Sequence, residues 1–237
     1  MSSQIKSLIF AAVLCIACSV LLTGANTGLK PLQQRNMAVD RHRNVLLALG
    51  LIREGEAVPN AQIESLYDTY IKSIQVDRDG KILTPAEARE DQLPLYVYVK
   101  QEQIEAYVVP INTRGLWGEI NGYLAIENDG TTIRGFTVYK HTETPGLGGE
   151  IESRWFRKNF ENKKIVNAQG SFASIGIAKG AVTDVIPEPK RDNYVDGISG
   201  ATLTGKYLSA GLKDILQDYE PVAIEFRQKN LRYLRVQ

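Results

Sequence analysis

The sequence has few cysteines, few histidines and almost no net charge. Two cysteines among 237 residues are too few for a disulfide-stapled scaffold. His42 and His141 are the two histidines, which excludes a histidine-rich metal site, and we expect no bound metal ion. Lys and Arg number 28 and Asp and Glu 27, so the chain lacks the basic excess of a nucleic-acid-binding protein. We therefore expect no nucleic-acid partner.

The sequence also lacks the common catalytic motifs. It contains no P-loop, no G-x-G-x-x-G, no H-E-x-x-H and no G-x-S-x-G. Its composition, 43% hydrophobic and 23% charged, is that of an ordinary globular protein, which excludes disordered, collagen-like and coiled-coil chains. Roughly 210 residues outside the N-terminus suffice for one sizeable domain with an extension.

An uncharged apolar run occupies the N-terminus. Residues 8–22 contain one polar side chain, Ser19, and nothing from Ser7 to Ala25 is ionisable. A helix of about 18 such residues is roughly 27 Å long, close to the ~30 Å hydrocarbon core of a bilayer. We expect a transmembrane helix over 7–25, with residues 1–6 in the cytoplasm. A cleaved signal peptide, a lipidated Cys18 and a buried core helix are the alternatives.

The charges beside this run leave the orientation open. Lys6 precedes it, whereas four basic residues follow it, which by the positive-inside rule favours a cytoplasmic body. Signal-like N-termini, however, usually send the following domain outward, and long domains translocate largely regardless of flanking charge. We expect a single-pass protein of the inner membrane whose body faces the periplasm. Cys15 and Cys18 lie inside the run, where cysteine serves as a small hydrophobic residue.

In the rest of the chain, apolar residues first recur with the period of a helix and then, after about residue 90, with the period of a strand. Apolar residues recur at threes and fours over 34–54 and 63–74, so residues 26–90 are predicted to be a helical extension. The following domain, over 91–220, is predicted to be α+β, with an antiparallel sheet and flanking helices. Its expected strands are 95–99, 106–109, 123–126, 133–139 and 182–186, with a turn at 128–130, and its main helices follow residue 149 and span 202–219. Residues 221–237 are expected to be a polar, basic tail.

The segment from Asp196 to Thr202 is the first candidate site. Ser199 is a natural N-cap for the last helix, and Gly200 lets the backbone approach a ligand closely. The free N–H groups of a helix N-terminus attract an anion, but by only about 0.3–1 kcal/mol, whereas micromolar binding needs about 8 kcal/mol. A cofactor here would therefore need a covalent bond or a large stacking pocket. An ordinary cap and turn is the alternative.

The segment from His141 to Gly149 is the second candidate site. It follows a strand and contains a proline and three glycines, so its backbone amides can lie against a flat ring. His141 could act as a base, although a lone histidine is more often structural. A tight surface connection is the alternative for the whole segment.

Both segments resemble motifs of one family. Asp196-x-x-Ser199-Gly200-Ala201-Thr202 resembles the flavinylation motif D-x-x-S/T-G-A-T, and residues 141–148 resemble a loop with the pattern H-x-E-T-P-G-L-G. Together with the Gly-Leu-Trp-Gly segment at 115–118, the N-terminal anchor and the length, they resemble the FMN-binding C subunit of the sodium-translocating NADH:quinone reductases. The sister family, the G subunit of the Rnf ferredoxin–NAD complex, shares the first two motifs but is usually shorter and lacks the G-L-W segment.

The resemblance implies an electron-relay subunit, not expected to be active alone, in which a flavin transferase attaches FMN by a phosphoester to Thr202. It also implies other partners: the membrane subunits and an NADH-oxidising subunit with FAD and iron–sulfur, in a complex that reduces ubiquinone and moves sodium. The implied cofactor-binding residues are Asp196, Ser199, Gly200, Ala201, His141, Glu143, Thr144, Pro145, Gly146, Leu147, Gly148, Leu116 and Trp117. An Rnf-type subunit, another flavin-tethered reductase and a non-redox binding module remain the alternative functions.

Overall fold

The computed structural model describes residues 3–84, 87 and 92–233. The chain divides into two compact units, one ending at Asp40 and the other beginning at Arg41. The first unit consists of the N-terminal part of helix α1 (Ser3–Ala48). Within the described residues, α1 is the one helix long and apolar enough to cross a membrane, and its apolar window is fully exposed. Leu8, Phe10 and Leu21 are each about 70% exposed, which suits a lipid environment and not water.

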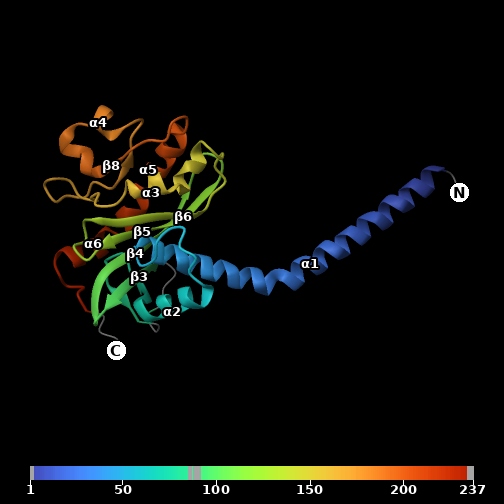
Figure 1. Ribbon diagram of the computed structural model, residues 1–237, viewed down its shortest axis with the longest axis horizontal. Helices are drawn as coiled ribbons and strands as arrows, with labels where there is room; N and C mark the ends of the chain where they lie inside the picture. Colours follow the sequence, from blue (N-terminus) through green and yellow to red (C-terminus); the bar gives the residue numbers. More distant parts are fainter. Residues whose placement is uncertain (1–2, 85–86, 88–91, 234–237) are drawn as a thin grey trace. The chain divides into compact units, whose positions relative to one another are not determined.

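The second unit, here called the body, is built around a six-stranded antiparallel sheet (Figure 1). The strand order is β2-β1-β3-β4-β5-β6. The bounds are β1 (Ile71–Val76), β2 (Ile82–Leu83), β3 (Leu93–Lys100), β4 (Gln103–Arg114), β5 (Glu119–Glu127) and β6 (Ile133–Lys140). The predicted hairpin is formed by β5 and β6, and the turn between them includes Gly130, whose φ is +66°.

Helices cover both faces of this sheet. On one face, α5 (Thr202–Asp218), α6 (Glu220–Arg227) and α3 (Arg154–Lys158) complete the main core with side chains such as Tyr107, Leu124 and Phe136. On the other face lie α2 (Asn60–Tyr70) and the end of α1, where Leu46 and, just after the helix, Leu49 are buried. Because the middles of the central strands β4 and β5 are covered on both faces, residues 106–111 and 123–126 are apolar without interruption.

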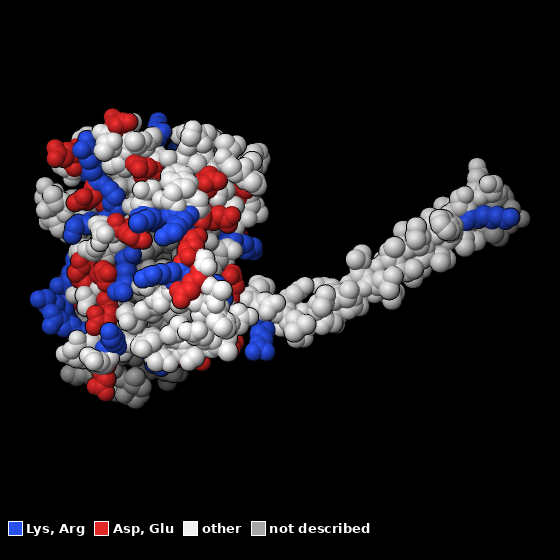
Figure 2. Space-filling model, viewed as in Figure 1, with Lys and Arg blue, Asp and Glu red and all other residues white. Residues whose placement is uncertain are grey.

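Shorter elements complete the body. They are the 3-10 helices Gly148–Glu152 and Glu188–Asn193, the helix α4 (Val182–Val185), and the parallel pair β7 (Gly176–Ile177) and β8 (Tyr194–Val195). Strand β7 is held against α5, since the Ile177 amide donates to Ser209 Oγ at 2.8 Å. Figure 2 shows Lys, Arg, Asp and Glu intermixed over the visible face of the body and almost no charged side chain along most of the N-terminal helix.

The fold class is confirmed, but four local predictions are wrong. The helix predicted over 63–74 ends at Tyr70, because Ile71–Val76 pairs with β3, so the sheet begins inside the segment predicted to be a helical extension. Residues 182–186, predicted to be a strand, form α4. Helix α1 ends at Ala48, not near residue 54. The predicted polar tail begins with α6, whose Val222 and Phe226 are buried.

Candidate functional site

The first candidate segment forms a tight turn that leads into α5. Gly200 has a φ of +74°, a left-handed backbone conformation that favours glycine, and its Cα faces Leu147 Cδ2, which lies 2.8 Å from where a Cβ would stand. The Ala201 amide donates to the Ile198 carbonyl at 3.1 Å within the turn. The Ala201 carbonyl then accepts the first helical hydrogen bond, from the Gly205 amide at 3.0 Å, so Thr202 is the first residue of the helix. Ser199, predicted to be the N-cap, is not: Ala201 takes that position and no side chain caps the helix. Ser199 and Thr202 are both exposed.

Asp196 fixes the start of this turn. Its Oδ1 accepts a hydrogen bond of 2.7 Å from the Val182 amide at the first turn of α4. The next residue, Gly197, donates its amide to the Gly180 carbonyl at 2.9 Å and lies so close to the Ala178 carbonyl that no Cβ would fit. Asp196 thereby ties the turn before α5 to α4, and Gly197 ties it to the residues that follow β7.

Glu143 joins the three segments that the sequence singled out. Its side chain is 4% exposed, and its two oxygens each accept a hydrogen bond. Oε2 accepts from Thr204 Oγ1 in the first turn of α5 at 2.6 Å, and Oε1 accepts from the Trp117 amide at 2.9 Å. Gly115 and Gly148 flank the carboxylate so closely that a Cβ on either would collide with it. The predicted segments therefore meet around one buried carboxylate.

The loop from His141 to Gly149 is held by its own hydrogen bonds. His141 Nδ1 accepts from the Glu143 amide at 3.1 Å, and its Nε2 lies 3.1 Å from Glu152 Oε2. The amides of Leu147 and Gly149 both donate to the Thr144 carbonyl. Both nitrogens of His141 and both oxygens of Glu143 are thus engaged inside the protein, and their predicted contacts with a cofactor stay predictions.

Apolar and small residues of these segments reach the surface. Trp117 is 68% exposed and Leu147 43% exposed, while Leu116 is half-buried. Thr144, Pro145 and Gly146 are exposed, Gly148 is buried against Thr204, and Ala201 is buried beneath the turn. The structure therefore brings Leu147 against Gly200 and leaves an exposed apolar surface beside the start of α5.

Thr202 also lines a cleft that sequence reasoning missed. The cleft, of about 560 Å³, lies between α5 and residues 173–179, with Asn193 and Tyr194 completing its wall. This volume falls within the range of small-molecule sites. Three lysines line it: Lys179, Lys206 and Lys213. No motif marks residues 173–179, so only the packing of β7 against α5 reveals this wall.

A buried hydroxyl in the cleft lacks a hydrogen-bond partner. Ser174 is 3% exposed and has a φ of +64°, and among the described residues its Oγ has no donor or acceptor within reach. Buried polar atoms are nearly always hydrogen-bonded, so an orphaned hydroxyl lining a cleft is suited to a polar ligand. The cleft thus offers apolar walls, a hydroxyl without a partner and positive charge, a combination that fits a phosphorylated aromatic cofactor.

Comparison with known proteins agrees with this geometry. The family model of the FMN-binding domain matches residues 115–217, which include all three segments. The C subunit of the Na(+)-translocating NADH-quinone reductase of Pseudomonas aeruginosa is 30% identical over 234 residues, covering 86% of this chain and 88% of that one. The corresponding C subunit of Yersinia pestis is 34% identical over 231 residues, covering 84% and 83%.

Solved structures lead to the same family. The crystal structure of the C subunit of Na(+)-translocating NADH-quinone reductase from Parabacteroides distasonis is 28% identical, with a TM-score of 0.70, and covers 82% of this chain and 96% of that one. A Shewanella oneidensis structure, 21% identical with a TM-score of 0.66, shares the fold. Because relatives at 30% identity or more are matched over most of both chains, this chain belongs to the family of the C subunit of Na(+)-translocating NADH-quinone reductase.

Proposed function

We propose that the chain carries electrons through an FMN that is joined by a phosphoester to Oγ1 of Thr202. Its family membership makes it a subunit of an oxidoreductase complex with an FMN-binding domain. Its exposed apolar helix, long enough to cross a bilayer, supports a membrane anchor. The attachment to Thr202 is our inference from the motif and from the environment of that hydroxyl.

The single observation that carries the proposal is the difference between the hydroxyls around the turn. Thr204 is 2% exposed, and its hydroxyl donates to Glu143 at 2.6 Å, so it is neither accessible nor free to react. Thr202 is exposed, occupies the first position of α5 and lines the cleft. Ser199 is also exposed, but the cleft does not include it. Thr202 is therefore the accessible hydroxyl from which a tethered group can enter the cleft.

The surroundings of Thr202 suit the phosphate of such a link. A phosphodiester keeps one negative charge, which the N-terminal end of the 17-residue helix α5 stabilises. Lys206, on the next turn of the helix, adds positive charge on the same cleft. The flavin itself would supply the electron-carrying chemistry, while the protein positions it and sets its electrostatic surroundings. Ser174 Oγ is the polar group most suited to bind it inside the cleft.

The cellular setting is part of the same proposal. Residues 1–6 would lie in the cytoplasm, residues 7–25 would cross the inner membrane, and the body would face the periplasm. A covalent tether is useful there if free FMN is scarce. The partners would be the other subunits of the complex, including the NADH-oxidising one with FAD and iron–sulfur, and a flavin transferase for maturation. The near-complete match with C-subunit relatives favours this assignment over an Rnf-type G subunit.

Replacement of Thr202 tests the attachment. Thr202→Ala should give a folded chain without flavin, because the accepting oxygen is gone, whereas Thr202→Ser should retain some flavin because it keeps a hydroxyl. Ser171→Ala is the control, since it removes an exposed hydroxyl outside both the 196–202 motif and the cleft and should leave flavin content unchanged. The chains are produced with a flavin transferase and compared by in-gel fluorescence after denaturing electrophoresis and by intact mass. Flavin mass retained on Thr202→Ala, or lost from Ser171→Ala, would contradict the proposal.

A further inference from the structure

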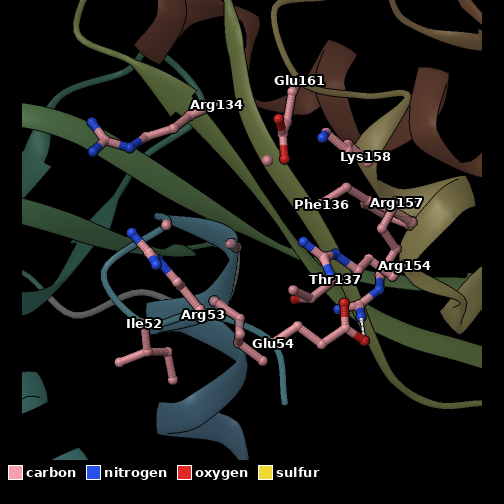
Figure 3. Close-up of a pocket in the computed structure, with 14 residues that line it drawn as sticks. Ile52, Arg53, Glu54, Arg134, Phe136, Thr137, Arg154, Arg157, Lys158 and Glu161 are labelled. Carbon is pink, nitrogen blue, oxygen red and sulfur yellow. Dashed lines mark hydrogen bonds and ion pairs between the residues drawn. The ribbon is translucent and has the colours of Figure 1, made fainter. Parts of the chain in front are cut away.

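The body contains another cleft, which shares no lining residue with the cleft at Thr202. Three segments line it: residues 47–54 at and after the end of α1, residues 134–137 of β6, and residues 154–161 in and after α3 (Figure 3). Its volume is about 290 Å³. Five cations and two carboxylates line it: Arg53, Arg134, Arg154, Arg157, Lys158, Glu54 and Glu161. This local excess of positive charge contrasts with the near-neutral chain.

The floor of this cleft is firmly built. Gly135 on β6 lies so close to the Ala48 carbonyl at the end of α1 that no Cβ would fit between them. Thr137 Oγ1 donates to the Asn44 carbonyl at 3.2 Å, and Arg134 Nε donates to the Leu49 carbonyl at 2.7 Å. The end of α1 is thus joined to β6 along the base of the cleft, which fixes the spacing of its walls.

The ion pairs within the cleft leave charge unbalanced. Arg157 pairs with Glu54, and Arg134 pairs with Glu127 at 3.2 Å. Arg53, Arg154 and Lys158 form no ion pair with any described residue, and neither does Glu161. Three unpaired cations against one unpaired carboxylate leave two positive charges without a partner.

A buried donor in the cleft is also unsatisfied. The Arg157 side chain is largely enclosed, with 12% of it exposed, and its Nε is buried without an acceptor among the described residues. Since buried N–H groups are rarely left unpaired, this atom indicates a missing acceptor. Figure 3 shows Arg53 and Arg134 on one side of the cleft and Arg154, Arg157 and Lys158 on the other.

We propose that this cleft binds a phosphate dianion, either inorganic phosphate or the phosphomonoester of a small molecule. A phosphomonoester carries about −1.5 to −2 charges at pH 7, which matches the two unbalanced positive charges. Guanidinium groups bind phosphate oxygens through paired, charge-assisted hydrogen bonds. The small volume, at the lower limit for small-molecule sites, suits one phosphate-sized group. A carboxylate or a phosphodiester carries one charge and would leave the other unbalanced.

Binding is tested on the full-length, flavin-loaded chain in detergent by isothermal titration at constant ionic strength set with chloride. We expect one inorganic phosphate or glycerol 3-phosphate per chain, with dimethyl phosphate, a monoanion of similar shape, bound at least roughly tenfold more weakly. Binding of both anions indicates free phosphate as the ligand. Binding of glycerol 3-phosphate alone indicates a phosphomonoester. The double variant Arg53→Gln/Arg154→Gln should lower affinity at least about tenfold, because it removes two charge-assisted donors.

The matched control is Lys100→Gln/Lys190→Gln, which removes the same formal charge from exposed positions outside this cleft. It should bind phosphate like the unmodified chain. Circular dichroism checks that each variant is folded. The proposal is overturned if no probe binds saturably, if dimethyl phosphate binds as tightly as phosphate, or if the two double variants weaken binding equally. Flavin attachment at Thr202 plays no part in any of these outcomes.

Discussion

At the scale of single residues, the buried carboxylate of Glu143 organises the candidate site. It receives one hydrogen bond from a side chain of α5 and another from the backbone beside Trp117. A buried acceptor that loses one donor keeps its desolvation cost, so removal of a partner is more costly than the hydrogen bond alone suggests. The position of α5 relative to the other two segments should therefore depend on Thr204.

Thr204→Val tests this dependence. The variant keeps the shape of threonine but removes the hydroxyl, which should lower the free energy of unfolding by about 1–3 kcal/mol. It should also lower the fraction of chains that acquire flavin, because Thr202 lies one half-turn away on the same helix. Thr204→Ser, which retains the donor, should restore most of both properties. Denaturant unfolding followed by tryptophan fluorescence and the flavin-to-protein absorbance ratio measure them. Equal stability of the valine and unmodified chains would show that this hydrogen bond is dispensable.

His42 is a second residue whose environment has a measurable consequence. Its ring stacks on Tyr67 at a centroid distance of 3.7 Å, and its buried Nδ1 has no partner among the described residues. Burial lowers the pKa of His42, although the nearby carboxylates of Asp68 and Glu64 act in the opposite direction. The folded protein therefore prefers neutral His42.

The stability of the body should accordingly fall as the pH is lowered. Below pH ~6.5 the unfolded chain binds a proton at His42 that the folded chain resists, so stability is lost as pH falls toward the lowered pKa. His42→Phe keeps a stacking ring without the titration. As the pH is lowered from 7 to 5, the melting temperature of the variant should therefore rise relative to that of the unmodified chain. A constant difference over that interval would rule out this role for His42.

At the scale of secondary structure, helices and strands with a clear apolar period could be predicted from the sequence, whereas segments that fit both periods could not. The strands 95–99 and 106–109 and the helix from Thr202 carry clear patterns, and the structure confirms them. Ile71 and Ile74 fit a helical face as well as a strand, so only pairing with β3 decides that β1 is a strand. Likewise, the hydrogen bond from the Val182 amide to Asp196 holds a helical turn where β-branched residues indicated a strand.

The same contrast holds for the candidate site. Its three segments carried recognisable motifs, and the structure brings them together around Glu143. The wall of the Thr202 cleft could not be predicted, because residues 173–179 reach α5 through a backbone-to-Ser209 contact that leaves no trace in the local sequence. Ser199 has the chemistry of an N-cap, yet the chain turns through the left-handed Gly200 before the helix begins, so the cap is Ala201, two residues later.

At the scale of the whole molecule, the C-terminal residues complete the core. Phe226 of α6 is 2% exposed and stacks on Tyr107 of the central strand β4, with ring centroids 4.4 Å apart. Gly130, in the turn between β5 and β6, lies against the Ala223 carbonyl so closely that no Cβ would fit. Helix α6 thus packs on one face of the sheet, against β4 and the β5–β6 turn, although residues 221–237 had been predicted to be a polar tail.

Phe226→Ala should destabilise the whole body. Removal of a fully buried aromatic ring costs about 3–5 kcal/mol through lost burial and the cavity that remains. Ile224→Ala is the matched control on the same helix, because Ile224 is 37% exposed and its truncation should cost much less. Denaturant unfolding of the full-length chain in detergent, followed by tryptophan fluorescence, compares the two variants. Trp117 and Trp155 both lie outside α6, so their fluorescence reports on the rest of the body. A loss of stability in this signal for Phe226→Ala would establish that α6 belongs to the cooperative core. Equal, small effects of the two substitutions would make residues 220–227 an appended helix.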